Sequence, residues 1–362
     1  MFVAWRDLKF AKGRFALMGT VIVLITLLVG LLSGLTAGLG QQNISAITGL
    51  PADKIAFQAP SGGQKLSYAN STVTQQQWRQ WAKTPGVTSA EPLGITTTKA
   101  TAADKSTGVS AFGVTPGSPL APDSSQINDQ SAVLSTTAAN DLGVKPGDNF
   151  TLAGQQLTVA AVQGDASFSH TPVIWTSLNT WHKVAPPTAG SDGPTATVIA
   201  LNTTSDTDVT ATDQAAGTQT VSKQDSLSAI GSYTSENGSL QLMRGFLFAI
   251  SALVIGAFFT VWTIQRSGDV AVLKALGAST EGLLKDALGQ AVILLAGGTL
   301  IGTGIAAGIG ALVAGSAVPF LLTPATVLLP AAVMILLGAL GAGLSIRRIT
   351  SVDPLTALGS AR

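Results

Sequence analysis

Three long stretches of the chain carry no charged side chain, and they constrain its fold more than any other feature. They cover residues 15–52, 245–265 and 287–346. A helix of about 20 apolar residues crosses the hydrocarbon core of a bilayer, where the backbone must satisfy its own hydrogen bonds. The pattern therefore predicts an α-helical membrane protein.

The third stretch is too long for one crossing. Pro319, Pro324 and Pro330 interrupt it, and proline breaks a helix interior because it lacks the N–H and its ring clashes with the preceding turn. We therefore expect two spans in this stretch and one in each of the others. The expected transmembrane helices cover residues 15–40, 239–265, 286–317 and 327–346. A cleaved signal peptide is disfavoured, because the first apolar run is much longer than the usual apolar core of about 7–15 residues.

Basic residues gather beside some of the expected spans and are missing beside others. They lie in residues 1–14, 266–285 and 347–362, whereas the loop between the third and fourth spans is uncharged. Since cytoplasmic flanks of transmembrane helices are enriched in Lys and Arg, we expect a multi-pass cell-membrane protein with both termini in the cytoplasm. Residues 41–238 then form an extracytoplasmic segment between the first and second helices.

This segment has the chemistry of a folded domain. Residues 41–236 hold 9 basic and 14 acidic side chains, a net charge of −5, and a segment of this length can bury its own core. Strand-like runs recur along it, and residues 149–162 are predicted to form a hairpin around Gly154. Further strands are expected at 108–114 and 196–201.

Helices are also predicted inside the segment, at 74–83 and 136–142, the second of which would end at Gly143. We therefore expect a large α+β domain. Its linkers to the membrane are predicted at 40–50 and 222–238.

The two ends of the chain are predicted to hold short helices. Residues 1–14 place Phe2, Trp5 and Leu8 at helical spacing beside basic residues, which favours an interfacial helix on the inner leaflet; the alternative is a basic flank that only sets topology. The tail 347–362 contains Asp353 and Pro354, residues suited to the start of a helix.

Residues 266–285 follow the second span and are predicted to be a short amphipathic helix. Val270, Leu273 and Leu276 fall on one face of it, and Asp269 lies beside them. Gly277 can end this helix, and Ser279 can cap the next one. From spacing alone the segment is either an inert turn or a docking element for a cytoplasmic partner.

Three motifs give the chain a family resemblance. The stretch 265–279 resembles the QRxxEIxxLRAxGAS segment of FtsX-like, MacB-type ABC transporter permeases, and 347–359 is similar to their RRxxxxDPxxAL ending. The outer stretch 131–148 resembles their VLSxxLAxxLGxxxGD motif. The chain departs from the pattern at Asp269, where the family has Glu, and at residues 267–268, where bulkier charged residues are usual.

The resemblance implies a permease subunit that is not itself an enzyme. The sequence contains no Gly-x-x-x-x-Gly-Lys-Ser/Thr phosphate loop, so we expect ATP and Mg²⁺ to be bound by a separate cytoplasmic ABC ATPase dimer. The resemblance further implies a permease homodimer, with residues 266–285 as the coupling helix. It also implies mechanotransmission, in which the ATPases move the helices and the outer domain.

A net charge of +1 gives no support to nucleic-acid binding.

Glycines recur at helical spacing within two of the expected spans. Gly30, Gly34 and Gly38 share one face of the first span, and small residues at this spacing let helices approach closely. They serve either packing within one subunit or a dimer seam. The third span has two similar pairs, 298/302 and 304/308, for which internal packing is favoured. The spans hold no ionisable residue at mid-depth, which disfavours a proton relay or an ion-coupled transporter.

Polar and iron-ligating side chains gather around the start of the second span: Tyr233, Glu236, Met243 and Arg244. Tyr, Met and His side chains can ligate haem iron. In size and architecture the chain also resembles HrtB-type haem exporters, which implies that haem is the transported ligand. These four are therefore the candidate haem-binding residues. The alternatives are an aromatic anchor at the membrane interface for Tyr233, lipid-facing or packing surface for Met243, and a lipid headgroup contact for Arg244.

The chain has two His and no Cys, so we expect no resident metal site and no intrinsic cofactor. His170 and His182 are predicted to be surface or packing residues of the outer domain.

Three other functions are also compatible with the sequence. They are export of a lipid, peptide or antimicrobial, control of a cell-wall hydrolase as in cell-division members of the family, and membrane-anchored binding without transport.

Overall fold

A computed structural model describes residues 12–186, 193–265, 268, 272, 276–277, 279–313 and 318–350. The chain divides into two compact units. One, here called the helical unit, comprises residues 1–38 and 239–362; the other, the α+β domain, comprises residues 39–238.

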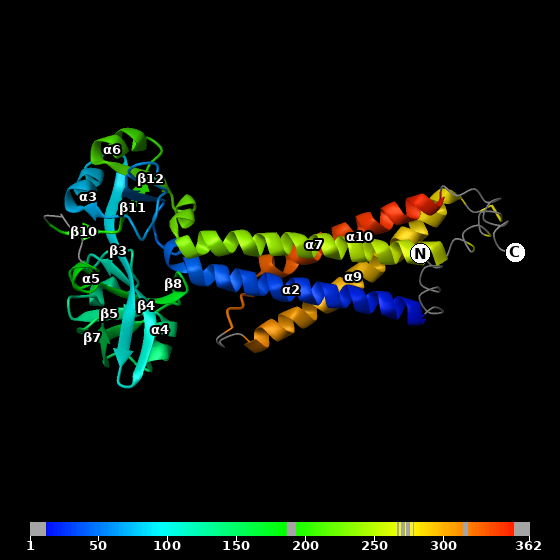
Figure 1. The fold of residues 1–362 in the computed structure, drawn as a ribbon, viewed down its shortest axis with the longest axis horizontal. Coiled ribbons are helices and arrows are strands. Elements are labelled where there is room, and N and C mark those ends of the chain that lie inside the picture. The colour runs from blue at the N-terminus through cyan, green and yellow to red at the C-terminus, as the bar shows by residue number, and fades with distance from the viewer. Residues whose placement is uncertain are drawn as a thin grey trace. The chain divides into compact units, whose positions relative to one another are not determined.

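Four helices dominate the helical unit (Figure 1). They are α2 (Lys12–Thr48), α7 (Gly231–Gln265), α9 (Thr280–Val313) and α10 (Pro324–Thr350). Each contains a segment long and apolar enough to cross a bilayer. The prediction of four transmembrane helices with an α+β domain between the first and second is confirmed.

The four helices share one apolar core. It combines residues from every helix, namely Met18, Ile22, Val29, Ile255, Phe259, Trp262, Ala291, Leu295 and Met334. Helix α9 lies close against α2 because glycine leaves room for it. A Cβ on Gly302 would lie 2.6 Å from the carbonyl oxygen of Val23.

The glycine row of α2 also faces neighbours within the chain. A Cβ on Gly30 would lie 2.9 Å from the Cβ of Ala306, and one on Gly34 would lie 2.3 Å from the ring of Phe320. For Gly38 the nearest atom, at 2.1 Å, is a backbone oxygen in the segment before α10. In this structure the row therefore packs inside one subunit.

The two glycine pairs of α9 differ from each other. Gly298 and Gly302 pack against α2, whereas a Cβ on Gly304 or Gly308 would meet no described atom within 4 Å. The expectation of internal packing thus fits only the first pair.

Helices occupy much of both predicted linkers. Helix α2 continues to Thr48 and α7 begins at Gly231. Residues 40–48 look polar in sequence, yet Ile44 and Ile47 pack into the core of the α+β domain. Burial of these side chains stabilises additional helical turns that propensity alone does not predict.

The α+β domain is built on one ten-stranded sheet. Its order is β12-β1-β11-β3-β4-β9-β5-β7-β6, with β8 paired to β9. The strands are β1 (Lys54–Gln58), β3 (Val87–Ala102), β4 (Lys105–Val114), β5 (Ser131–Leu134), β6 (Asn149–Leu152), β7 (Gln155–Val162), β8 (Ser167–Phe168), β9 (Thr171–Ser177), β11 (Val198–Thr203) and β12 (Thr218–Ser222). Two short strands, β2 (Val73–Thr74) and β10 (Thr195–Ala196), pair separately.

Four short helices cover this sheet (Figure 1). They are α3 (Gln75–Ala82), α4 (Thr136–Leu142), α5 (Leu178–Val184) and α6 (Val209–Ala216). The predicted helices at 74–83 and 136–142 are confirmed, and Gly143 ends α4 with a φ of +68°. The predicted hairpin is confirmed as the antiparallel pair β6–β7.

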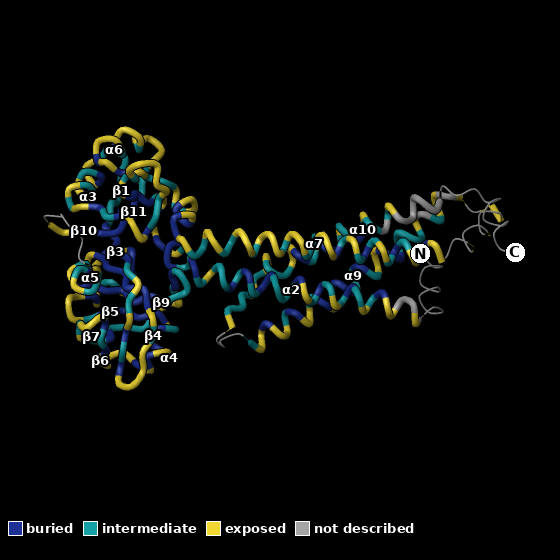
Figure 2. Tube along the Cα trace, viewed as in Figure 1, coloured by how far each residue is buried: buried dark blue, intermediate teal, exposed yellow. Residues whose placement is uncertain are grey.

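The long strand β3 contributes to three buried clusters, two of which lie under different helices. One lies beneath α3 and includes Trp78 and Trp81. Another lies beneath α4 and includes Leu142 and Phe150. The third cluster draws on strands β1, β11, β3, β4, β9 and β5, and it receives the end of α2. Dark, buried segments follow the strands in Figure 2.

Candidate functional site

The candidate site lies in the α+β domain, where a tight turn meets the ends of α2 and α7. The turn joins β8 to β9 and consists of Ser169 and His170, since Phe168 pairs with Thr171. Both turn residues have a positive φ, of +50° and +64°. Two-residue hairpin turns of this kind favour Asn and Gly, because other side chains pay a steric cost in the left-handed region.

Helix α2 holds this turn in place through backbone hydrogen bonds. The N–H of Ser169 donates to the carbonyl oxygen of Asn43 at 3.0 Å, and the N–H of His170 donates to that of Gln42 at 3.1 Å. Two residues beyond Asn43 on α2, the hydroxyl of Ser45 accepts from the N–H of Ser167 at 2.8 Å. The hairpin is therefore fastened to the last turns of α2.

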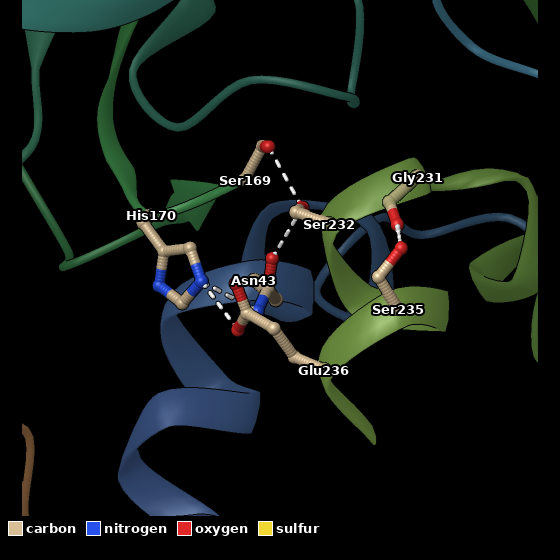
Figure 3. A network of polar contacts seen from close by, with 7 residues as sticks. All are labelled: Asn43, Ser169, His170, Gly231, Ser232, Ser235 and Glu236. Atoms are coloured by element: carbon tan, nitrogen blue, oxygen red, sulfur yellow. Dashed lines mark hydrogen bonds and ion pairs between the residues drawn. The ribbon is translucent and has the colours of Figure 1, made fainter. Parts of the chain in front are cut away.

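Side chains extend the attachment to α7 (Figure 3). The imidazole Nε2 of His170 lies 2.7 Å from Oε2 of Glu236, and the amide of Asn43 donates to the same oxygen at 3.0 Å. Ser232 donates to Oδ1 of Asn43 at 2.6 Å, and its hydroxyl lies 2.8 Å from that of Ser169. These five residues are called the junction network below.

The Nε2 of His170 faces two polar groups at once. It lies 2.7 Å from Oε2 of Glu236 and 2.9 Å from the amide nitrogen of Asn43, which donates to the same carboxylate oxygen. The network thus joins three chain segments, because residue 43 lies on α2, residues 169–170 form the turn, and residues 232–236 lie on α7.

The predicted haem-binding residues all lie on α7. At about 100° per residue, positions 233, 236, 243 and 244 fall within roughly 100° of one another on one side of this helix. Tyr233 is partly buried against the core of the α+β domain. Met243 is 47% exposed. Arg244 is half-buried, and its Nε has no hydrogen-bond partner in the part of the chain that the structure describes. The partners of Glu236 are His170 and Asn43.

Sequence reasoning missed His170 and Asn43 as members of a site. They are 127 residues apart, and neither belongs to a motif. The other histidine, His182, contacts the backbone of Thr195, whose N–H donates to its Nε2 at 3.1 Å. It therefore fulfils the predicted packing role. Among the described residues, no group of three His, Cys, Asp or Glu could hold a metal ion.

The predicted coupling segment is described only in part. Asp269, Val270 and Leu273 lie outside the described residues, as do the two predicted terminal helices at 1–14 (up to residue 11) and 347–362 (from residue 351). Leu276 is 79% exposed. The expected cap is present, since the N–H of Gly282 donates to the hydroxyl of Ser279 at 3.1 Å.

Two ionisable side chains of the α+β domain, both outside the junction network, have shifted pKa values. Burial raises the pKa of the Tyr68 phenol above its ordinary value, although a hydrogen bond to Ser226 opposes this. The hydrogen bond from Ser177 lowers the pKa of Asp129, helped by Asn179 and Lys183. Tyr68 therefore stays neutral and Asp129 stays ionised at neutral pH.

Comparison with known families agrees with this architecture. Residues 15–219 match the MacB-like periplasmic core domain, and residues 242–354 match the FtsX-like permease C-terminal domain. The chain belongs to the FtsX/MacB family of ABC transporter permeases. It is therefore the non-catalytic transmembrane component of an ABC transporter, which implies a partner ATPase.

Several named relatives match this chain along almost its whole length. A protein of Staphylococcus haemolyticus named as a hemin transport system permease, HrtB, is 26% identical over 368 residues, covering 99% of both chains. A Staphylococcus epidermidis protein of the same name is 25% identical over 373 residues, again covering 99% of both chains. An uncharacterized ABC transporter permease of Mycobacterium tuberculosis is 24% identical over 370 residues, with the same coverage.

Proposed function

We propose that this permease exports haem, taking it from the membrane and releasing it outside the cell. ATP hydrolysis by a separate ATPase dimer would drive the movement. The observation that carries the proposal is the grouping of Tyr233, Glu236, Met243 and Arg244 on one side of α7. Its relatives named for hemin transport support the choice of haem.

The chemistry of these four residues suits an amphiphilic, anionic macrocycle. The thioether of Met243 and the phenol of Tyr233 can ligate iron, and the guanidinium of Arg244 can pair with a carboxylate. Because Tyr233 packs against the domain core, the more exposed Met243 is the more accessible ligand. A partly buried, unpartnered Arg244 Nε also leaves a donor for a propionate group.

Coupling to ATP would use the cytoplasmic segment 266–285. In the proposed arrangement, its apolar face (Val270, Leu273 and Leu276, with Asp269 beside it) docks on the ATPase, and two permease subunits form a homodimer in the lipid bilayer. The junction network fastens α2 and α7 to the α+β domain. Movement of either helix would therefore be transmitted to that domain, as mechanotransmission requires.

Haem titration of the purified full-length protein in nanodiscs tests the proposal. We expect a saturable Soret shift that the Tyr233→Phe and Met243→Leu double variant loses. Met334→Leu is the matched control, because Met334 is 1% exposed in the helical core. Absence of a shift with the wild-type protein, together with ATPase stimulation by a lipid or peptide, would replace haem export by the alternative of lipid, peptide or antimicrobial export.

A further inference from the structure

A cleft in the α+β domain lies next to the junction network and has no role in the proposed function. Its volume is about 660 Å³, within the range of about 300–1,000 Å³ that is typical of small-molecule sites. The turn residue Ser169 and the first residue of α7, Gly231, line one end of it. The cleft therefore borders the segments that hold α7.

The cleft has an aromatic floor. Tyr68, Phe168 and Trp181 line it, and all three are less than 10% exposed. The rings of Tyr68 and Phe168 pack edge to face, with centroids 5.5 Å apart at 80°. A surface of this kind favours flat aromatic ligands, which gain both apolar burial and ring contacts.

Two glycines fix the position of Trp181. Gly94 on β3 and Gly113 on β4 are paired across the sheet, and a Cβ on either would lie within 2.4 Å of this tryptophan. The indole thus occupies a slot that the sheet leaves open for it. Its Nε1 is buried and has no hydrogen-bond partner among the described residues, although tryptophan N–H groups usually find one when buried.

The rim of the cleft is polar but uncharged. Ser67, Thr96 and Thr97 contribute hydroxyl groups, and none of the described lining residues is Asp, Glu, Lys, Arg or His. The phenol of Tyr68 stays neutral because burial raises its pKa, so it is unsuited to bind iron as a phenolate. The lining therefore offers contacts for an aromatic ring system and none for a metal.

We propose that this cleft binds the flat face of a porphyrin-type macrocycle and does so without coordinating its metal. The choice of macrocycle rests on the proposed haem function, while the cleft itself rests on its aromatic floor, size and uncharged rim. A macrocycle that has left the metal-ligating residues of α7 would then be held in the cleft by contacts to its ring system alone.

Metal-free protoporphyrin IX is the probe, used with the full-length protein in nanodiscs and corrected by empty nanodiscs. We expect saturable binding by fluorescence, with an apparent Kd that rises at least tenfold in Thr97→Trp, which fills the cleft from its exposed rim. Thr88→Trp is the matched control, because Thr88 is an exposed β3 residue outside the cleft. Ala69→Trp, from another part of the rim, gives a second independent obstruction.

Unchanged porphyrin affinity in both cleft variants, with unfolding midpoints matching the wild type, would overturn this inference. So would the absence of binding above empty nanodiscs. Failure of the proposed function is a separate outcome. In that case the haem Soret shift that depends on Tyr233 and Met243 would be absent, whereas protoporphyrin IX would still bind in the cleft.

Discussion

At the scale of single residues, the most informative side chain is His170. It lies in a strained two-residue turn, and its Nε2 is 2.7 Å from the carboxylate of Glu236 on α7. Backbone strain is retained where the surrounding contacts fix it, and such positions concentrate at functional sites. Both side chains are partly exposed, at 30% and 41%, so their contact contributes little to stability. We infer that its role is to keep α7 attached to the hairpin.

We expect His170→Ala to reduce haem release about fivefold or more while lowering the free energy of unfolding by only about 1 kcal/mol, the typical value of a hydrogen bond. The measurements are release of haem from proteoliposomes containing the ATPase and the thermal unfolding midpoint. His182→Ala, which changes the other histidine of the same domain, should retain release. Equal release by His170→Ala and wild type would contradict the coupling role.

A second residue-scale prediction concerns Asp129. The hydroxyl of Ser177 donates to its Oδ1 at 2.6 Å and lowers its pKa, and Ser177 also caps α5, the helix that carries Trp181. A lowered folded-state pKa stabilises the protein above the unfolded value near about pH 4, and this contribution is lost as the pH falls through the folded-state pKa.

Asp129→Asn should therefore lower the unfolding midpoint at pH 7 only slightly, because Asp129 is exposed and solvent screens its interactions. The difference from wild type should shrink as the pH falls below about 4 toward the lowered folded-state pKa of Asp129. Thermal unfolding between pH 3 and pH 7 checks this, and a constant difference over that range would exclude the assignment.

At the scale of elements, the contact between α2 and α9 depends on glycine. Substitution of Gly302 by Ala would place a Cβ 2.6 Å from a backbone oxygen of α2, so the helices would have to separate. Close packing of small residues is the main source of helix association in lipid, where the hydrophobic effect between helices is absent.

We expect Gly302→Ala to destabilise the protein by about 1–3 kcal/mol, the usual cost of overpacking. Gly304→Ala on the same helix is the control, because its Cβ would meet no described atom and alanine favours a helix by up to about 1 kcal/mol over glycine. The yield of folded protein after detergent extraction and heating distinguishes them. Equal losses for both variants would refute the packing argument.

At the scale of the whole molecule, the distribution of charge sets the orientation in the membrane. We expect both termini in the cytoplasm and the α+β domain outside, because the basic clusters flank the spans on a single side. The wild-type chain contains no cysteine, so single cysteines can be labelled without background. Ser205 is exposed on the α+β domain and Ser360 lies near the C-terminus.

A membrane-impermeant maleimide should label Ser205→Cys in intact cells and Ser360→Cys only after permeabilisation. Labelling efficiencies that differ by more than tenfold between the two sites in intact cells are expected. Labelling of Ser360→Cys from outside would reverse the topology and would remove the proposed coupling segment from the ATPase.

Local patterns were sufficient to predict the four spans, the β6–β7 hairpin and the end of α4 at Gly143. A membrane helix is specified locally, by about 20 consecutive apolar residues. A helix end at glycine is also local, because glycine adopts a positive φ without steric cost. The motifs at 131–148, 265–279 and 347–359 were likewise sufficient to identify the family, because each is continuous in the sequence.

Tertiary structure alone decided where α2 and α7 end and which residues meet there. Residues 40–48 become helical because Ile44 and Ile47 are buried by strands and loops far along the chain. His170 and Glu236 meet although 66 residues separate them, and the aromatic cleft is assembled from six separate segments. Sequence periodicity reports only on neighbours along one element, whereas these features arise from contacts between distant segments.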